Sequence, residues 1–236
     1  MNEMKLSQRL QKVADYIPEQ SVLADIGSDH AYLPCYAVKN GIARAAIAGE
    51  VVEGPYLSAV QQVQKSELES FVSVRKGDGL QVLEKGEAGC ITIAGMGGAL
   101  IAKILEQGKD RLSGKERLVL QPNIHAMHIR KWLLQYEWEL KDEEILEEDG
   151  KIYEILVAEK GNPTEPYQHI GLEAGMLLGP FLAKEKNEVF LKKWTHELKH
   201  WSSIIEKLNE GTLNEDNLAK KQELEHRISI VRESAL

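Results

Sequence analysis

Acidic side chains recur where short apolar runs of the chain end, and this arrangement could bind a ligand. Asp25 lies one residue before the end of the apolar run 22–26, Glu50 follows a second run, and Asp78 stands between two glycines. Parallel strands bring their carboxyl ends to one edge of a sheet, and ligands bind at that edge. Because carboxylates accept hydrogen bonds from hydroxyl and amino groups, we predict a pocket for a ligand that carries both.

The spacing of these acids favours a ligand that contains adenosine. Glu50 follows Asp25 by about 25 positions, close to the interval at which an acid accepts the hydroxyls of a bound ribose. Asp78 is suited to accept the exocyclic amine of an adenine. The glycines at 95, 97 and 98 leave space for a ligand close to the backbone.

Two missing motifs narrow the choice of cofactor. The chain has no G-x-G-x-x-G sequence of a dinucleotide-binding loop after the first predicted strand, where Asp29 replaces the second glycine, and no G-x-x-x-x-G-K-[ST] sequence for a nucleoside triphosphate. An acid late in the first strand can anchor the amino end of a methionine moiety through water or backbone. Together these features predict S-adenosylmethionine as the cofactor.

Alternating strand and helix patterns must position these residues. The predicted strands are 21–26, 44–49, 71–75, 89–94, 117–121, 138–146 and 151–159. The predicted helices are 5–17, which precedes the first strand, and 31–40, 55–68, 98–107 and 124–136, which lie between later strands. Strand–helix units that end in an antiparallel hairpin predict an α/β fold with a mostly parallel sheet. Dinucleotide-binding dehydrogenases would continue with parallel units instead.

The last part of the chain predicts a helical hairpin. After a linker at 161–167, glycines 171, 175 and 179 recur every four residues, which indicates close packing or a hinge. Apolar residues at spacings typical of a coiled coil follow in two series, Phe190, Trp194, Leu198, Trp201, Ile205 and Leu208, then Leu218, Leu224, Ile228 and Val231. Gly211 ends the first predicted helix, and a capping box at 212–215 starts the second. The hairpin could serve structural packing or dimerisation, or it could bind a large substrate.

The composition predicts a soluble cytoplasmic protein. The polar N-terminus lacks the apolar region of a signal peptide, and Cys35 and Cys90 lie in apolar contexts that suit reduced core residues. The net charge of −8 argues against a generic nucleic-acid binder, because such proteins are usually basic. The excess of acid is partly local, since acidic residues crowd the segment 142–149.

A short basic cluster follows the fifth predicted strand. His125 and His128 are three residues apart on a predicted helix, beside Arg130 and Lys131. A metal site would need further ligands, and none is evident in the sequence. We therefore predict no metal, and a solvated basic face that could meet RNA phosphate.

Four blocks carry most of the predicted site. They are Ala-Asp-Ile-Gly-Ser-Asp-His-Ala-Tyr-Leu-Pro at 24–34, Gly-Glu-Val-Val-Glu-Gly-Pro at 49–55, Arg-Lys-Gly-Asp-Gly-Leu at 75–80 and Ile-Ala-Gly-Met-Gly-Gly at 93–98. These blocks resemble the bacterial tRNA adenine-N1 methyltransferases that modify adenine 22. The resemblance spans the whole chain and implies a Rossmann-like class I methyltransferase domain at 1–165 and a helical coiled-coil domain at 166–236. It also implies S-adenosyl-L-methionine as cofactor and tRNA as partner.

The resemblance and the strand ends together define a predicted site. The predicted cofactor-binding residues are Asp25, Gly27, Glu50, Val51, Asp78, Gly79, Ala94, Gly95 and Met96. The predicted substrate-binding residues are His30, Tyr32, Pro34 and Asn123. The Asn/Asp-Pro-Pro-aromatic motif of exocyclic-amine methyltransferases is absent after the fourth predicted strand, which favours a ring nitrogen as the methyl acceptor.

Asp29 is the predicted catalytic residue because it leaves the first turn toward the methyl end of the cofactor. Adenine N1 carries a lone pair, so methyl transfer needs in-line positioning rather than a base. A carboxylate that accepts a hydrogen bond from the N6 amine would orient the ring and stabilise the cationic product. Alternatively, Asp29 could cap the helix that begins near Ala31, and Tyr32 could belong to the apolar face of that helix.

Two other functions are compatible with the sequence. The protein could methylate a small molecule or a protein, with the helical tail as a dimerisation element. It could also be a non-catalytic adenosine-binding module whose coiled coil recruits partners. Cofactor binding together with a map of methylated bases in tRNA would separate these functions. The oligomeric state is open between monomer and homodimer.

Overall fold

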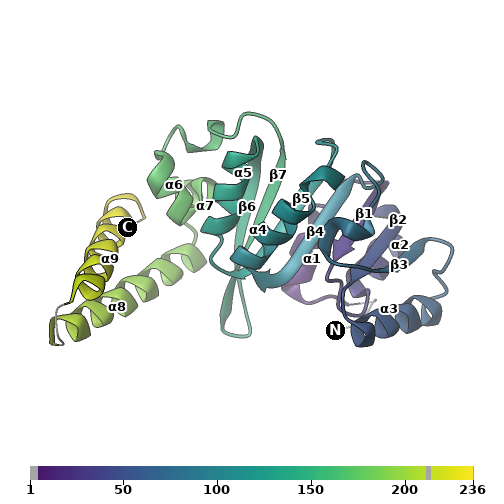
Figure 1. The fold of residues 1–236 in the computed structure, drawn as a ribbon, viewed down its shortest axis with the longest axis horizontal. Helices are drawn as coiled ribbons and strands as arrows, with labels where there is room; N and C mark the ends of the chain where they lie inside the picture. The colour runs from purple at the N-terminus through teal and green to yellow at the C-terminus, as the bar shows by residue number, and fades with distance from the viewer. Residues whose placement is uncertain (1–4, 211–213, 236) are drawn as a thin grey trace. The chain divides into compact units, whose positions relative to one another are not determined.

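The structure is a computed structural model that describes residues 5–210 and 214–235. The chain divides into two compact units, of which the first ends at Glu165 and the second begins at Pro166 (Figure 1). None of the helices among the described residues is long and apolar enough to cross a membrane.

A seven-stranded sheet forms the centre of the first unit, with the strand order β3-β2-β1-β4-β5-β7-β6. The strands are β1 Ser21–Ile26, β2 Ala43–Glu50, β3 Val72–Lys76, β4 Cys90–Gly97, β5 Arg117–Ile124, β6 Trp138–Glu148 and β7 Lys151–Lys160. The first five pair in parallel, and β7 pairs antiparallel with both β5 and β6. This topology confirms the predicted α/β fold, and it places the switch in strand order between β1 and β4, where open sheets bind ligands.

Helices cover the sheet and bury its apolar strands. They are α1 Gln8–Asp15, α2 Tyr32–Lys39, α3 Glu53–Lys65, α4 Gly98–Gln107 and α5 Met127–Gln135, with 3-10 turns η1 Gly79–Val82 and η2 Lys109–Arg111. Helices α4 and α5 pack against each other in front of the sheet in Figure 1. Cys35 and Cys90 are both buried free thiols, as predicted.

Strand β5 is longer than the sequence pattern indicates. The prediction ended the strand at Gln121 and started a helix at Ile124, but Pro122 and Ile124 still pair with β4. Helix α5 therefore begins at Met127. Proline is tolerated here because the pairing register is irregular at this end of the strand.

The second unit is helical. It contains α6 Leu172–Leu178, α7 Pro180–Glu185, α8 Glu188–Glu210 and α9 Glu215–Ser234, and the 3-10 turn η3 Glu165–Tyr167 spans the boundary. Helices α8 and α9 pack against each other. Their buried residues are Phe190, Trp194, Trp201, Leu224, Ile228 and Val231, all from the two predicted series.

Gly171 and Gly179 lie at the two ends of α6 with φ of 84° and 88°, and Gly175 packs closely against the ring of Tyr167. Two details of this unit differ from prediction. Leu218 is 48% exposed and does not belong to the apolar side of α9. The side chain of Asn214 caps α9, whereas the predicted cap at 212 lies outside the described residues.

Arg130 corrects the prediction of a solvated basic face. Its guanidinium is buried and forms ion pairs with Glu143 of β6 at 2.5 Å and Glu154 of β7 at 2.8 Å. These three side chains are 1%, 0% and 6% exposed. Arg130 therefore ties α5 to the terminal hairpin and does not face solvent.

The acidic segment of the hairpin holds the N-terminal helix. Glu148 accepts hydrogen bonds from the first amides of α1, at 2.5 Å from the nitrogen of Gln8 and 3.4 Å from that of Arg9. Tyr16 donates to Asp142 at 3.0 Å. The local excess of acid therefore has a structural use, because carboxylates at a helix N-terminus stabilise it.

Candidate active site

The turn that follows β1 meets the end of β4 at the switch in strand order. Gly27 has a φ of +71°, and a Cβ atom at this position would collide with the Met96 Cε atom. A glycine is therefore required both by the backbone conformation and by the close approach of Met96. Gly27 and Met96, two of the predicted cofactor-binding residues, thus lie next to each other.

Asp25 links the turn after β1 to strand β4. Its two carboxylate oxygens accept hydrogen bonds from Ser28 Oγ and Thr92 Oγ1, each at 2.6 Å. Burial raises the pKa of the Asp25 carboxyl, against the lowering effect of these two hydrogen bonds. In this structure Asp25 orders the turn before Asp29.

The turn itself carries three consecutive residues in the left-handed region. Asp29, His30 and Ala31 have φ of 41°, 72° and 54°, which is uncommon for residues other than glycine. The backbone amide of Asp29 donates to Glu50 Oε1 at 2.5 Å, and this bond helps to hold the turn. Such strained segments are typical of functional sites.

The strained turn presents a polar and aromatic cluster. The Asp29 side chain is 79% exposed, and one of its oxygens lies 3.5 Å from His30 Nε2. The rings of His30 and Tyr32 stack with centroids 5.4 Å apart. The N-cap of α2 is Ala31, whose methyl group cannot accept a hydrogen bond, so the alternative in which Asp29 caps this helix is wrong. Pro34 is buried within α2 and lies outside the cluster.

Glu50 and the turn after β3 form the neighbouring part of the edge. Burial raises the pKa of the Glu50 carboxyl; the amide of Asp29 opposes this shift, and the nearby charges of Asp25 and Asp29 add to it. The carbonyl of Glu50 accepts a hydrogen bond from the amide of Gly77 at 2.9 Å, next to the exposed Asp78. Val51 is 58% exposed at the same strand end.

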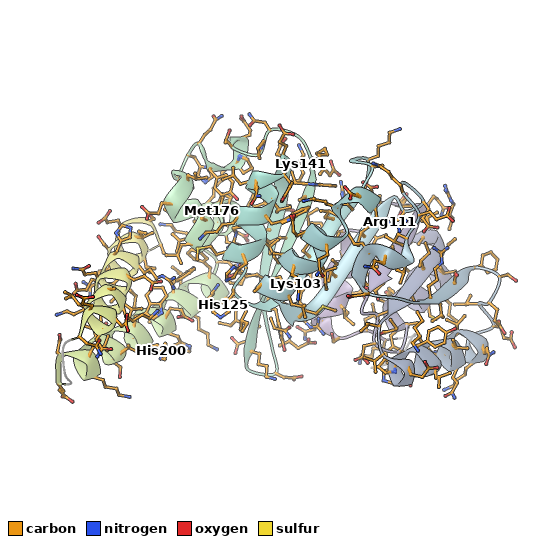
Figure 2. All side chains as sticks on the ribbon, in the orientation of Figure 1. Lys103, Arg111, His125, Lys141, Met176 and His200 are labelled. Atoms are coloured by element: carbon orange, nitrogen blue, oxygen red, sulfur yellow. The ribbon has the colours of Figure 1, made fainter. Side chains whose placement is uncertain are left out.

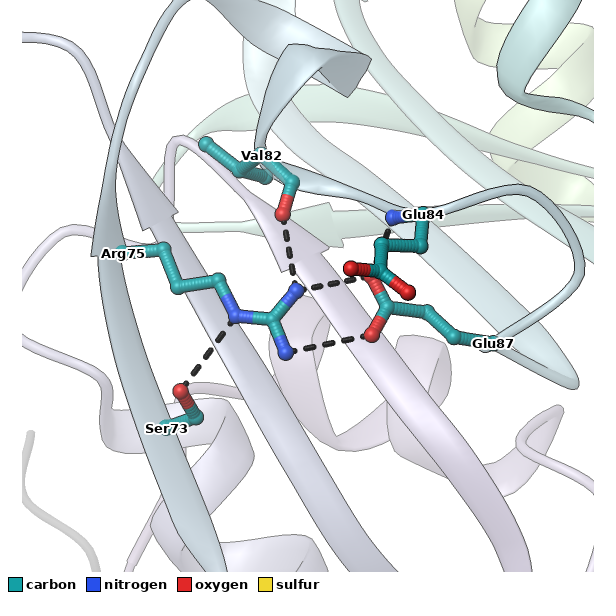
Figure 3. Close-up of polar contacts among 5 residues, drawn as sticks. All are labelled: Ser73, Arg75, Val82, Glu84 and Glu87. Atoms are coloured by element: carbon teal, nitrogen blue, oxygen red, sulfur yellow. Dashed lines mark hydrogen bonds and ion pairs between the residues drawn. The ribbon is translucent and has the colours of Figure 1, made fainter.

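Arg75 fixes the segment that follows Asp78. It donates to both carboxylate oxygens of Glu87, at 2.7 and 3.1 Å, and to the carbonyl of Val82 at 2.9 Å (Figure 3). This bidentate pair holds η1, whose first residue is Gly79 with a φ of 54°. Arg75 was not among the residues predicted for the site.

Strand β4 continues to Gly97 instead of ending at Ala94 as predicted, and β5 holds its irregular end. The amide of Gly95 donates to Gln121 Oε1 at 2.9 Å, and its carbonyl accepts from Asn123 Nδ2 at 2.8 Å. Asn123 therefore supports the predicted cofactor loop of Ala94, Gly95 and Met96, in addition to any contact with substrate. Gln121 was missed, although a buried glutamine at the end of an apolar strand is a signal that could have identified it.

Arg9 of α1 also reaches this loop and was missed. Its Nη1 atom donates to Gln121 Oε1 and lies 3.7 Å from the position of a Cβ atom on Gly95. In the sequence Arg9 is one of several charged residues of an amphipathic helix, so no local signal distinguishes it.

The basic groups around α5 are fewer than predicted. His125 has a φ of 60° and forms an edge-on ring contact with His128, and both side chains are exposed, as is Lys131. Helix α4 adds the exposed Lys103 (Figure 2). Among the residues that the structure describes, no group of three or more metal-ligating side chains comes together.

The arrangement fits a nucleoside with an extended chain. The sheet order places the ends of β3, β2, β1 and β4 side by side, which spans about 14 Å at the usual strand spacing. Glu50 and Asp78 at one end can accept hydrogen bonds from ribose and adenine, and the backbone at Gly27 and Gly95 forms the other end. S-adenosylmethionine has this shape and these donors.

Comparisons with known proteins agree with this geometry. A sequence model of the tRNA (adenine(22)-N(1))-methyltransferase family matches residues 23–233. The curated tRNA (adenine(22)-N(1))-methyltransferase of Bacillus subtilis (strain 168) is 64% identical over 233 residues, which cover 99% of this chain and 98% of the relative.

Solved structures agree over the full length as well. The crystal structure of the B. subtilis M1A22 tRNA methyltransferase has a TM-score of 0.96 and 62% identity, and it covers 98% of this chain and 99% of its own. The Streptococcus pneumoniae protein Sp1610, solved in complex with S-adenosyl-L-methionine, has a TM-score of 0.86 and 40% identity, and it covers 98% and 100%.

Proposed function

The chain belongs to the tRNA (adenine(22)-N(1))-methyltransferase family, and we propose a role in the family's reaction for each part of its site. The protein transfers the methyl group of S-adenosyl-L-methionine to N1 of adenine 22 in tRNA. The observation that carries this function is the 64% identity with the B. subtilis enzyme over 99% of the chain. Methylation of a small molecule or a protein, or a non-catalytic role, is not favoured.

Asp29 is the proposed catalytic residue. When bound, S-adenosylmethionine supplies an electrophilic methyl group on its sulfonium; N1 of adenine forms the new bond to carbon as the bond from sulfur breaks. The adenine gains the positive charge that the sulfur loses. The exposed Asp29 carboxylate can accept a hydrogen bond from the N6 amine and stabilise that charge as it develops. The reaction needs no base, because N1 already carries a lone pair.

The stacked pair of His30 and Tyr32 supports a proposed position for the target base. Enzymes that modify a base must extrude it from the stack, and they hold it against aromatic side chains. The ring pair follows Asp29 directly on the strained turn. A base stacked on Tyr32 would bring its N6 amine toward the Asp29 carboxylate.

The function is tested with tRNA that carries no modifications. After incubation with the protein and S-adenosylmethionine, a map of methylated nucleosides should contain N1-methyladenosine at position 22 and nowhere else. Methylation of another position, or none although the cofactor binds, would contradict the proposed function. The reaction on tRNA also implies that the protein works in the cytoplasm.

Glu50 is the proposed acceptor for the ribose hydroxyls, which predicts a pH dependence of cofactor binding. Hydroxyl groups donate to the ionised carboxylate, and burial raises the pKa of that carboxyl. The affinity for S-adenosylhomocysteine should therefore be constant above the raised pKa and should fall as the pH decreases through it. Calorimetric titrations from about pH 8 to about pH 5 measure this effect.

The Glu50→Gln variant is the control for this pH dependence. It keeps an acceptor oxygen but cannot ionise, so it should bind the cofactor more weakly and lose the dependence on pH. A variant that retains the wild-type pH profile would assign the titration to another group.

The division into two units supports a proposal in which one unit transfers the methyl group and the other binds tRNA. Residues 1–165 form the class I methyltransferase domain, and residues 166–236 form a helical domain that holds the tRNA. Lys192, Lys199 and Lys207 of α8 are exposed and recur at intervals of seven and eight residues, which places them on one side of the helix. A row of cations suits the phosphates of an RNA backbone.

Replacement of Lys192, Lys199 and Lys207 together by serine should weaken tRNA binding about tenfold at moderate salt and reduce its salt dependence. The affinity for S-adenosylhomocysteine should stay within about twofold of wild type. Filter binding over a range of salt concentrations measures the first effect and calorimetry the second. Unchanged tRNA affinity would favour a packing or dimerisation role for the helical hairpin.

A further inference from the structure

Arg9 is brought to the cofactor site by a helix that precedes the sheet in sequence. Its Nη1 atom donates to Gln121 Oε1, the same oxygen that accepts from the amide of Gly95 at 2.9 Å. Gln121 is fully buried, so this junction is fixed from within the sheet. Arg9 therefore lies beside the irregular end of β4.

Arg9 forms no close ion pair in the described part of the chain. Its other contact is with a ring, since the guanidinium carbon lies 5.4 Å from the centroid of Tyr153. The residue is half-buried. Moving a charge out of water without a counterion raises the free energy of the folded protein. A site that retains such a charge is suited to an anion. The same charge acts on the buried Asp25 in the direction that lowers its pKa.

The position of Arg9 is reinforced by the terminal hairpin. Glu148 binds the first amides of α1, including that of Arg9, and Lys12 forms an ion pair with Glu144 at 3.4 Å. Tyr16 is bound to Asp142 at the other end of the helix. The helix is thus attached along its length, which limits the movement of the guanidinium.

The sheet order identifies the anion. If adenosine lies over Glu50 and Asp78 at the ends of β2 and β3, the amino-acid end of the cofactor extends across β1 toward β4. That end carries an α-carboxylate, which in this orientation would meet the turn of Gly27 and the end of β4 at Gly95, beside Arg9. Only Nη1 of the guanidinium donates a side-chain hydrogen bond within the described residues, and an arginine can bind a carboxylate through two nitrogens.

We propose that Arg9 binds the α-carboxylate of the methionine moiety of S-adenosylmethionine, so that α1 completes the cofactor site. This assignment rests on the proposed function, because it takes the cofactor's orientation from the roles of Glu50 and Asp78. Arg9 would then set the distance of the sulfonium from the target base by holding one end of the chain.

The test compares two ligands that differ only in the carboxylate. Calorimetry measures the binding of S-adenosylhomocysteine and of its decarboxylated analogue S-adenosyl-3-thiopropylamine to wild type, Arg9→Ala and Arg9→Lys. Arg9→Ala should weaken S-adenosylhomocysteine binding about 10- to 100-fold, the range for a hydrogen bond to a charged group. Its affinity for the decarboxylated analogue should change by less than about twofold. Arg9→Lys should recover part of the lost affinity.

Lys39→Ala is the matched control, because it removes an exposed cation at the C-terminal end of α2 that takes no part in the proposed site. It should leave the binding of both ligands unchanged. Equal losses of both ligands in Arg9→Ala would show that Arg9 only supports the β4 loop, and no loss of either would show that it does not touch the cofactor. Both results overturn the proposal. Failure of the wild-type protein to bind S-adenosylhomocysteine would instead refute the proposed function.

Discussion

Replacement of Asp29 by alanine should lower the rate of methyl transfer to tRNA by about 100- to 1,000-fold, the loss typical of removing one electrostatic stabiliser of a transition state. The affinity for S-adenosylhomocysteine should change by less than about threefold. The reason is that the Asp29 side chain is 79% exposed, whereas its bond to Glu50 is made by the backbone amide, which the substitution retains. Single-turnover methylation and calorimetry measure the two effects.

Asp29→Asn separates the charge from the conformation of the turn. Asparagine tolerates a positive φ better than alanine does, so this variant keeps the φ of 41° with little strain. It retains an acceptor for the N6 amine but loses the negative charge, and we expect an intermediate rate. Asp78→Ala should show the opposite pattern, with a large loss of cofactor affinity. Equal losses of rate and affinity in Asp29→Ala would make Asp29 a cofactor ligand.

The sequence predicts most of the sheet because its strands are buried on both sides and therefore appear as short apolar runs. Strand β1 begins and ends where the pattern places it, at Ser21 and Ile26. The rule that ligands bind at the carboxyl ends of parallel strands then brings Asp25, Glu50 and Asp78 to one edge. Site residues that lie at strand ends can thus be predicted from the sequence.

The contacts that support the site could not be predicted from the sequence in the same way. Arg9 meets Gln121 across 112 positions of the chain, and Asn123 meets Gly95 across 28. Helical or strand periodicity shows which face of an element is apolar, but it does not show which polar side chain on the other element lies opposite. Arg130 was placed on a solvated face for this reason, because its partners belong to the terminal hairpin.

The buried ion triad of Arg130, Glu143 and Glu154 gives the largest expected effect on stability. Arg130→Ala should lower the free energy of unfolding by about 3–5 kcal/mol, because it leaves two carboxylates buried without their counterion. Urea denaturation followed by circular dichroism measures the loss. The adjacent Lys131→Ala is the matched control, since Lys131 is exposed and its replacement should cost less than about 0.5 kcal/mol.

A triple variant distinguishes a buried charge from a loss of packing. Replacement of Arg130 by methionine and of Glu143 and Glu154 by leucine removes all the charges and keeps most of the volume. Buried ion pairs replaced in this way are often neutral or stabilising, so the triple variant should be at least about 2 kcal/mol more stable than Arg130→Ala. If both variants lose the same stability, the effect of Arg130→Ala comes from packing between α5 and the hairpin rather than from unpaired carboxylates.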